Sequence, residues 1–176
     1  MFESTFLNPE KVIEELDLRD NMIAVDFGSG AGGWAIPLAK KLEEGKVYSI
    51  DVQEEMLSAL KSRAAIENIL NIETIVCDLE NPEKLELVDN FFDIILMTNL
   101  FFQIKNKKKV LREAQRILKK GGQILVVDWK KESALGPREG KVTDEEIKKI
   151  AENLGLELKK EFEAGEYHYG LVFTKP

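Results

Sequence analysis

A glycine-rich turn between an apolar strand and a helix constrains the fold of this chain more than any other feature. Residues 22–27 are apolar except for Asp26, and they lead into Gly28-Ser29-Gly30-Ala31-Gly32-Gly33, ahead of a helical pattern over 34–42. Glycines at the start of a helix let a ligand approach bare backbone at the positive end of the helix dipole. The order of strand, glycine turn and helix therefore predicts a site for a nucleotide-like cofactor.

The same alternation of strand and helix continues along the chain. Hydrophobic patterning predicts helices over residues 7–18, 54–68 and 106–120 and after Thr143, and strands over 22–27, 46–51, 72–77, 91–97, 123–128, 156–162 and 167–174. In helix 54–68 the face expected to point inward carries Met56, Leu57, Leu60, Ala64 and Ile66. Alternating strands and helices indicate a doubly wound α/β sheet.

The last two strands depart from this pattern. About four residues, 163–166, connect them, whereas a parallel crossover needs roughly a dozen or more. The fold expected is therefore a seven-stranded mixed sheet with six parallel strands and an antiparallel last strand. We expect one domain over residues 1–176, with a cap helix within 1–20 and a C-terminal β-hairpin over 156–176.

The glycine turn fits two cofactor patterns. Gly28, Gly30 and Gly33 match the dinucleotide fingerprint G-x-G-x-x-G, while Gly28, Gly30 and Gly32 after Asp26 match an acidic-x-G-x-G-x-G pattern. The first pattern leaves a nicotinamide-dependent oxidoreductase as an alternative. A protein that holds the cofactor as a sensor, without turnover, is a further alternative.

Three acids at the ends of neighbouring strands favour the second pattern. Asp26 ends the first predicted strand, Asp51 the second, and Asp78 follows the third. A carboxylate at Asp26 would repel a pyrophosphate, while one at Asp51 can accept the hydroxyls of a ribose. An acidic rim of this kind suits a cationic sulfonium better than a dinucleotide.

These motifs, in their order, resemble those of class I S-adenosylmethionine-dependent methyltransferases, and most closely the UbiE-like group. The residues that carry the resemblance are Val25 to Gly32, Tyr48-Ser49-Ile50-Asp51-Val52 with Met56, Cys77-Asp78-Leu79, Phe92-Asp93-Ile94-Ile95 with Asn99, Leu111 to Ala114, Leu118 to Gly122, and Asp128-Trp129. The resemblance covers roughly residues 9–176 and implies a Rossmann-like methyltransferase fold. It also implies S-adenosylmethionine as cofactor and S-adenosylhomocysteine as product.

The resemblance further implies which residues bind the cofactor. The glycine turn with Asp26 would face the methionine end, Asp51 the ribose, Val52 the adenine face, and Asp78 with the Leu79 backbone the adenine amine. The turn at Asn99 would lie near the sulfonium. The cofactor-binding residues expected are Asp26, Gly28, Ser29, Gly30, Gly32, Asp51, Val52, Met56, Asp78, Leu79, Asn99 and Leu100.

The acceptor is expected to bind where the remaining strands end. Methyl transfer is an in-line displacement at an activated carbon, so alignment and exclusion of water matter more than a strong base. The residues expected to line the acceptor pocket are Phe101, Phe102, Gln103, Trp129, Tyr167 and His168. His168 and Asp128 are the candidates for a catalytic base.

Composition narrows the partners. A net charge of -7 disfavours nucleic acid, and one cysteine with one histidine offers no metal cluster. With no apolar run of about 18 residues and no signal-like start, we expect a cytoplasmic protein with a small-molecule acceptor and no membrane span. Residues 105–120 hold eight Lys or Arg and one Glu, a local +7 that leaves an RNA or protein acceptor as an alternative. No sequence feature indicates the oligomeric state.

Overall fold

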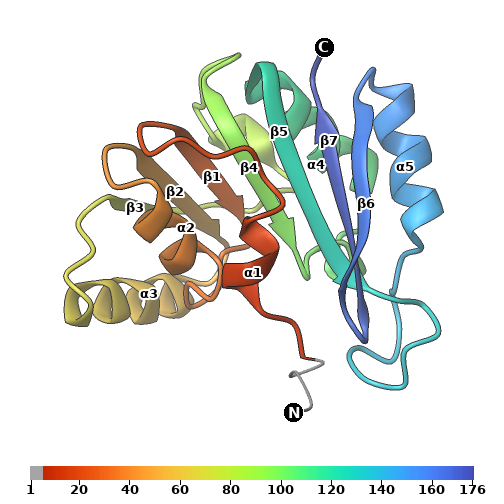
Figure 1. Ribbon diagram of the computed structural model, residues 1–176, viewed down its shortest axis with the longest axis horizontal. Helices are drawn as coiled ribbons and strands as arrows, with labels where there is room; N and C mark the ends of the chain where they lie inside the picture. The colour runs from red at the N-terminus through yellow and green to blue at the C-terminus, as the bar shows by residue number, and fades with distance from the viewer. Residues whose placement is uncertain (1–5) are drawn as a thin grey trace.

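Seven strands form one mixed sheet in the computed structural model, which describes residues 6–176 (Figure 1). The strand order is β3-β2-β1-β4-β5-β7-β6. Their bounds are β1 Ile23–Phe27, β2 Lys46–Asp51, β3 Ile72–Val76, β4 Phe92–Thr98, β5 Leu118–Trp129, β6 Glu157–Gly165 and β7 His168–Thr174. The order reverses between β1 and β4, which is the point where open α/β sheets bind their ligands.

The strand directions confirm the predicted fold class. β1 pairs with β2 and β4 in parallel, as do β2 with β3 and β4 with β5. β7 pairs antiparallel with both β5 and β6, so it alone runs against the other six strands. The turn between β6 and β7 consists of residues 166–167, whereas the sequence predicted a connection of about four residues. A connection of two residues is typical of antiparallel neighbouring strands.

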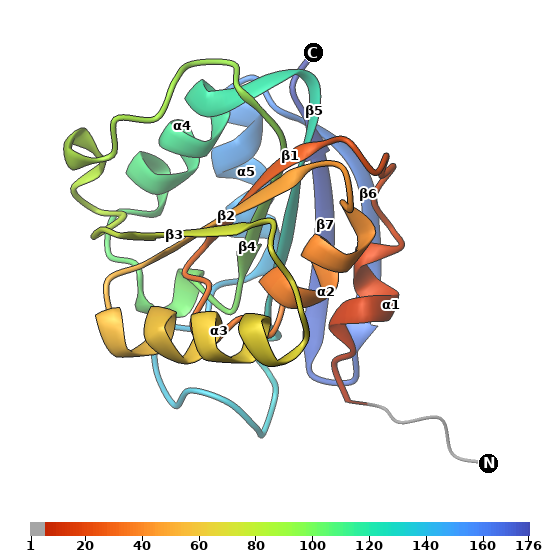
Figure 2. The same ribbon diagram turned by 90° about the vertical axis from the view of Figure 1, so that its left-hand side faces the viewer.

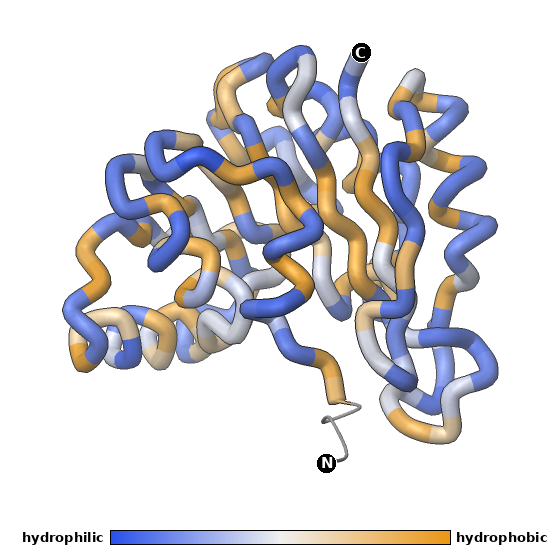
Figure 3. The backbone as a smooth tube through the Cα atoms, viewed as in Figure 1, coloured by the Kyte–Doolittle hydropathy of each residue, from blue (hydrophilic) through white to orange (hydrophobic). Residues whose placement is uncertain are grey.

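Helices cover both faces of the sheet (Figure 2). On one face, an apolar cluster contains residues of α1 (Pro9–Ile13) and α2 (Ala35–Lys41) together with Leu60 of α3 (Glu54–Ile66). On the opposite face, a second apolar cluster contains residues of α4 (Lys107–Ile117) and α5 (Asp144–Asn153). The central strands are the most hydrophobic part of the chain, and the loops the most polar (Figure 3). No helix within residues 6–176 is long and apolar enough to cross a bilayer.

The entry helix is shorter than predicted. The predicted helix over 7–18 is confirmed only in its first half: α1 begins at Pro9 with Asn8 as its N-cap, but it ends at Ile13 and does not reach Leu18. After Ile13 the backbone hydrogen bonds span three residues instead of four, as where Leu16 N–H donates to the Ile13 carbonyl at 3.1 Å. This tightening lets Leu16 and Leu18 pack against the sheet outside a helix. Residues 1–5 of the expected cap segment lie outside the described residues.

The inward face of α3 is narrower than predicted. Leu57, Leu60 and Ala64 are buried at helical spacing, whereas Met56 is 41% exposed and Ile66 80% exposed. Placing Met56 and Ile66 inward is therefore wrong. The helix lies beside the outer strands β2 and β3, where only a single row of side chains meets the sheet.

The helix α4 ends earlier than predicted, and β5 begins earlier. Helix was expected to continue to Lys120, but Leu118 is already strand and aligns with Phe92 of β4. Gly121 N–H donates to the Lys175 carbonyl at 2.7 Å, so the two glycines pair with the C-terminal end of the chain. This pairing, between segments more than 50 residues apart, overrides the local helical preference. The helix expected after Thr143 is α5, and Thr143 and Glu146 form a capping box at its start.

Candidate cofactor and acceptor site

The glycine turn lies at the carboxyl end of β1. Gly28, Gly30 and Gly32 all adopt positive φ angles, of 72°, 52° and 88°. A Cβ on Gly28 would lie 2.8 Å from Leu100 Cδ1, and one on Gly32 would lie 2.9 Å from Leu60 Cγ, while Gly30 faces open space. Backbone conformation and close packing together therefore require glycine at positions 28 and 32.

Asp26 is a buried carboxylate directly before this turn. Its side chain is fully buried, and neither oxygen has a hydrogen-bond partner within the described chain. Burial, with a smaller contribution from the charge of Asp51, raises the pKa of Asp26 to about 7. Ser29 Oγ and Asn99 Oδ1 are likewise buried without a partner. Unpaired buried polar atoms are rare and point to a missing ligand.

The other two acids are held by backbone donors. Asp51 Oδ2 accepts a hydrogen bond from Gly30 N–H and Oδ1 accepts one from Gln53 N–H, both at 2.9 Å. Asp78 Oδ1 accepts from Glu80 N–H at 2.9 Å, and Oδ2 accepts from the Asn81 amide at 2.6 Å. The loops after β2 and β3 therefore fix both carboxylates at the same edge as the glycine turn.

A cavity of about 280 Å³ lies between these loops and the end of β4. Seven residues expected at the site line it, namely Gly28, Asp51, Val52, Asp78, Leu79, Leu100 and Gln103. The side chain of Val52 is 61% exposed, so it is accessible to a ligand in the cavity. Met56, which was also expected at the site, does not line the cavity. Sequence reasoning missed four residues that also line the cavity, Gln53, Cys77, Glu80 and Ile104. Each is adjacent in sequence to a residue that was expected there, and this position was the available signal.

The turn after β4 is organised by Asp128. Asn99 adopts a positive φ of 48°, unusual for a residue other than glycine, and the chain then turns into a short 3₁₀ helix, η2 (Phe101–Gln103). Asp128 Oδ2 accepts hydrogen bonds from the N–H groups of Leu100 at 3.2 Å and Phe101 at 2.8 Å, and Oδ1 accepts one from Trp129 N–H. Burial raises the pKa of Asp128 to about 6, although these three donors oppose the shift. Its carboxylate thus holds the turn in place.

The residues expected to line the acceptor pocket separate into two groups. Trp129 and His168 are cross-strand partners on β5 and β7, with ring centroids 4.0 Å apart. Tyr167 is half-buried at the hairpin turn, and Phe102 and Gln103 are accessible on η2. Placing Phe101 in the pocket is wrong, because its side chain is fully buried in the core cluster that contains α4. The i→i+3 turn of η2 directs that ring inward.

His168 is buried and uncharged at neutral pH. It is 5% exposed, and Nε2 is buried without a partner in the described chain. Burial, together with the nearby charge of Lys130, lowers the pKa of His168 to about 4. A neutral imidazole nitrogen of this kind can accept a proton or a hydrogen bond from a bound molecule.

The fold and the site together define the class I S-adenosylmethionine-dependent methyltransferase type. The family described as methyltransferase domain matches residues 18–169 of this chain. The chain therefore belongs to that family, and the curated relatives to which it is similar include UbiE methyltransferases, the group that the sequence motifs resemble. No group of three His, Cys, Asp or Glu that could hold a metal ion occurs within residues 6–176.

Two curated relatives and two solved structures illustrate the similarity. The chain is 30% identical over 120 residues to the ubiquinone/menaquinone biosynthesis C-methyltransferase UbiE of Hydrogenovibrio crunogenus, and 29% identical over 128 residues to a demethylmenaquinone methyltransferase of Bacillus mycoides. These matches cover 68% and 72% of this chain but 46% and 53% of the relatives. The chain thus spans about half the length of those curated relatives.

The structural matches cover the chain more fully. A SAM-dependent methyltransferase from Aquifex aeolicus superposes with a TM-score of 0.87 at 31% identity, over 98% of this chain and 92% of that one. A putative type 11 methyltransferase from Sulfolobus solfataricus gives 0.76 at 27% identity, over 97% and 94%. Family membership disfavours the nicotinamide interpretation of the glycine turn.

Proposed function

We propose that this protein transfers the methyl group of S-adenosylmethionine to a small-molecule acceptor by direct in-line displacement. The observation that carries the proposal is Asp26, a fully buried carboxylate without a partner beside a glycine turn. Burying such a carboxylate costs free energy unless a cation or a strong hydrogen-bond donor pairs with it. The cofactor brings both an ammonium group and a sulfonium, so its binding would offset that cost.

The residues present fit this cofactor. Asp26 and the backbone of residues 28–32 would hold the methionine end, and Asp51 the ribose hydroxyls. The adenine would occupy the cavity of about 280 Å³, against Val52 and with its amine near Asp78 and the Leu79 N–H. Met56 would approach only the outer rim. When bound, the cofactor supplies a methyl group already activated by positive sulfur, close to the Asn99 turn.

We further propose a quinone-type acceptor in its reduced form. The support is the similarity to relatives named for ubiquinone, menaquinone and demethylmenaquinone methylation, at about 30% identity. A hydroquinone ring would place a flat apolar surface beside Trp129, with a hydroxyl toward His168. His168 is uncharged at neutral pH and can accept a hydrogen bond from that hydroxyl, although a pKa lowered to about 4 makes its imidazole a weak base.

His168 would act as the proton acceptor. Loss of the hydroxyl proton to Nε2 makes the neighbouring ring carbon nucleophilic; the carbon then takes the methyl group, and its own hydrogen leaves as a proton when the ring becomes aromatic again. A His168→Gln variant keeps a hydrogen-bonding side chain but cannot carry the proton. We expect kcat to fall about 100-fold with the affinity for S-adenosylhomocysteine changed less than about twofold. Unchanged kcat would remove His168 as the base.

The basic segment does not favour RNA as acceptor. Lys109, Arg116 and Lys119 form ion pairs with acids outside the segment, namely Glu83, Asp89 and Asp93. These three acids offset part of the local +7, which weakens the electrostatic case for a nucleic-acid partner. A cytoplasmic location stays a prediction.

Two measurements test the function. Titration calorimetry with S-adenosylhomocysteine should show binding that NADH does not compete with. Labelled methyl transfer should then be measured with 1,4-naphthohydroquinone, with total tRNA and with a protein extract as acceptors. Binding of the product without transfer to any acceptor would favour the sensor alternative, and labelling of RNA or protein alone would overturn the small-molecule assignment.

A further inference from the structure

We propose that Asp128 is a positioning residue for the methyl transfer, because its two carboxylate oxygens hold the cofactor-side turn and the acceptor-side strand end at once. The inference rests on the proposed function, since it takes the methyl group to lie near the Asn99 turn and the acceptor to react beside His168. It extends that function by assigning the relative placement of the two sites to one buried side chain.

One carboxylate oxygen fixes the cofactor side. Asp128 Oδ2 accepts hydrogen bonds from the N–H groups of Leu100 at 3.2 Å and Phe101 at 2.8 Å. Leu100 lines the cavity of about 280 Å³, and a Cβ on Gly28 would lie 2.8 Å from its Cδ1 atom. A shift of the Leu100 backbone would therefore change the shape of the cavity and the packing on the glycine turn.

The other oxygen fixes the acceptor side. β4 pairs with β5 only as far as Thr98 with Val127, so the ladder on that edge has ended before Trp129. Asp128 Oδ1 accepts the hydrogen bond of Trp129 N–H at 2.8 Å. The ring of Trp129 lies against that of His168, with centroids 4.0 Å apart. Asp128 thus fixes the end of β5 at the residue that packs on the imidazole.

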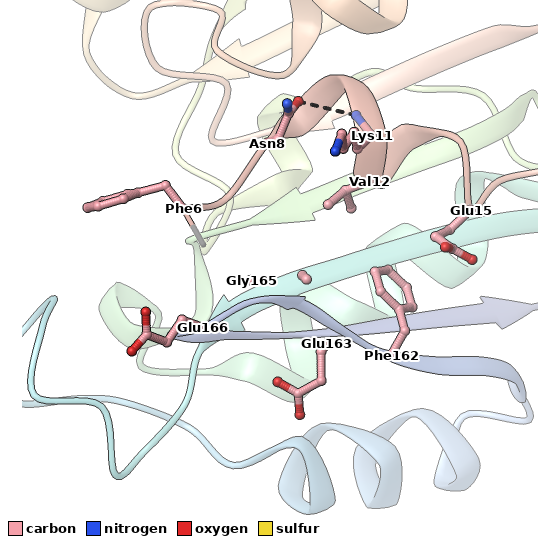
Figure 4. Close-up of a pocket in the computed structure, with 10 residues that line it drawn as sticks. Phe6, Asn8, Lys11, Val12, Glu15, Phe162, Glu163, Gly165 and Glu166 are labelled. Atoms are coloured by element: carbon pink, nitrogen blue, oxygen red, sulfur yellow. Dashed lines mark hydrogen bonds between the residues drawn. The ribbon is translucent and has the colours of Figure 1, made fainter. Parts of the chain in front are cut away.

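The position of His168 depends on Trp129, because its opposite neighbour contributes no side chain. The cross-strand partner of His168 on β6 is Gly165. Gly165 borders the groove between α1 and the β6–β7 hairpin, a space of about 440 Å³ across which Val12 and Phe162 point toward each other (Figure 4). Of the two residues directly opposed to His168, only Trp129 has a side chain. A displaced Trp129 should therefore move the imidazole.

Asp128 acts through the backbone and not on the acceptor. Its cross-strand partner is Tyr169, whereas Trp129 and His168 form the next pair along the strands. Because successive side chains of a strand point to opposite faces of the sheet, Asp128 lies on the face away from the imidazole. All three hydrogen bonds that it accepts come from backbone N–H groups. A positioning role therefore fits this carboxylate better than that of a proton acceptor.

The test variant is Asp128→Asn, with Asp93→Asn as a matched control. The amide nitrogen of Asn is a donor, so one acceptor oxygen is left for three N–H groups on two sides. Asp93 also accepts from a backbone N–H, that of Ile23 at 2.9 Å, and pairs with Lys119, but it lies near the amino end of β4, away from the site.

The two variants should differ in binding and in turnover. For Asp128→Asn we expect the affinity for S-adenosylhomocysteine to fall about tenfold. Its kcat with 1,4-naphthohydroquinone should fall about 30- to 100-fold, because the methyl group and the acceptor are misaligned. Asp93→Asn should leave both quantities within about twofold of the wild type, since it is remote from both sites.

His168 itself reports on the acceptor side, because it is the one histidine of the sequence. Its carbon-bound protons lie in the ring current of Trp129, and their NMR signals are assigned by their loss in His168→Gln. We expect Asp128→Asn to move these signals in ligand-free protein and Asp93→Asn to leave them in place. A carboxylate that only stabilised the fold would leave the signals of the folded molecules unchanged.

A further variant covers the case in which Asp128→Asn does not fold. Asp128→Glu keeps a charged acceptor but carries it one methylene further from the backbone, so it should also weaken product binding and move the His168 signals. If the variant that folds matches the wild type in either measurement, Asp128 does not join the two sides and the proposal is overturned. If the wild type methylates no hydroquinone, the proposed acceptor fails, while calorimetry and NMR still test Asp128 alone.

Discussion

The cofactor end and the acceptor end of the sheet each bury an ionisable side chain without a partner, and the two pKa values shift in opposite directions. At the cofactor end, burial raises the pKa of Asp26 to about 7, so the carboxyl is only partly ionised at neutral pH. At the acceptor end, burial lowers the pKa of His168 to about 4, so the imidazole stays uncharged. The same desolvation therefore disfavours the charged form at both ends, and only Asp26, whose pKa lies close to neutral, can ionise readily when a cationic ligand binds.

The two ends also differ in how the chain builds them. The cofactor end uses the carboxyl ends of three strands that follow one another in the chain: Asp26 lies near the end of β1, Asp51 ends β2, and Asp78 follows β3. The acceptor end joins segments far apart in sequence, because α1 faces β6 and Trp129 pairs with His168. We therefore expect substitutions at the cofactor end to act on cofactor binding, and those at the acceptor end on turnover.

The largest expected effect is on the pH dependence of stability. Because Asp26 has a pKa of about 7 in the folded protein and 3.8 when unfolded, the folded state binds more protons between these values. The free energy of unfolding should then fall as pH rises from about 4 to 7, by roughly 4 kcal/mol from this group. Asp26→Asn should remove that slope in ligand-free protein, as measured by urea unfolding across this range.

His168 gives the matched comparison. Its pKa is depressed, so its contribution to stability is present above about 6.5 and is lost as pH falls toward 4, the opposite sign to Asp26. His168→Gln should flatten this second slope. If Asp26→Asn and His168→Gln changed the pH dependence of the free energy of unfolding in the same direction, the two pKa values would not be shifted in opposite directions as described.

The next effect is on cofactor affinity. Asp26→Asn keeps the shape of the side chain but loses its charge, and a hydrogen bond to a charged group contributes about 1.5–3 kcal/mol. We expect S-adenosylhomocysteine to bind about 10- to 150-fold more weakly, by calorimetry. The wild-type affinity should also increase as pH rises through 7, where Asp26 ionises. An unchanged Kd in the variant would mean that Asp26 does not contact the ligand.

An effect of comparable size is expected on stability, and it separates two glycines of the same turn. Gly32→Ala would bring a Cβ to 2.9 Å from Leu60 Cγ at a φ of 88°, whereas the same change at Gly30 meets no atom within 4 Å. We expect Gly32→Ala to lower the free energy of unfolding by about 2–4 kcal/mol and Gly30→Ala by about 1 kcal/mol. Thermal melts of the two variants would show equal losses if packing against α3 were unimportant.

The smallest effect is expected on α4. Lys108 and Arg112 are exposed, lie one turn apart and have no ion pair among the described residues. Reversing both charges, as Lys108→Glu with Arg112→Glu, should change kcat/KM for a small-molecule acceptor less than about twofold. A large loss of activity would indicate that an acidic macromolecule binds this helix.

Much of the cofactor end could be predicted from the sequence because its signals are local. The glycine turn and Asp51 follow directly from strands whose boundaries match those predicted to within a residue. Gln53, Cys77, Glu80 and Ile104 were missed at the cavity because nothing in their local sequence pattern separates a residue that lines a ligand site from one in a core or a loop.

The acceptor end was predicted less well, for a physical reason. Phe101 was placed in the pocket, but the turn held by Asp128 directs its ring into the core. The groove at Val12 and Phe162 had no sequence signal, since its two walls come from segments 150 residues apart.

The sequence by itself determined the alternation of strands and helices, the reversed last strand and the three acids that mark the cofactor end. These depend on periodicity, connection length and residue type, all of which are local. Only the tertiary structure decided that Asp26 is buried without a partner, that His168 lies against Trp129, and that α1 and the hairpin enclose a groove. Burial and long-range contact determine those properties, because desolvation depends on every element that packs around a group and not on its neighbours in the chain.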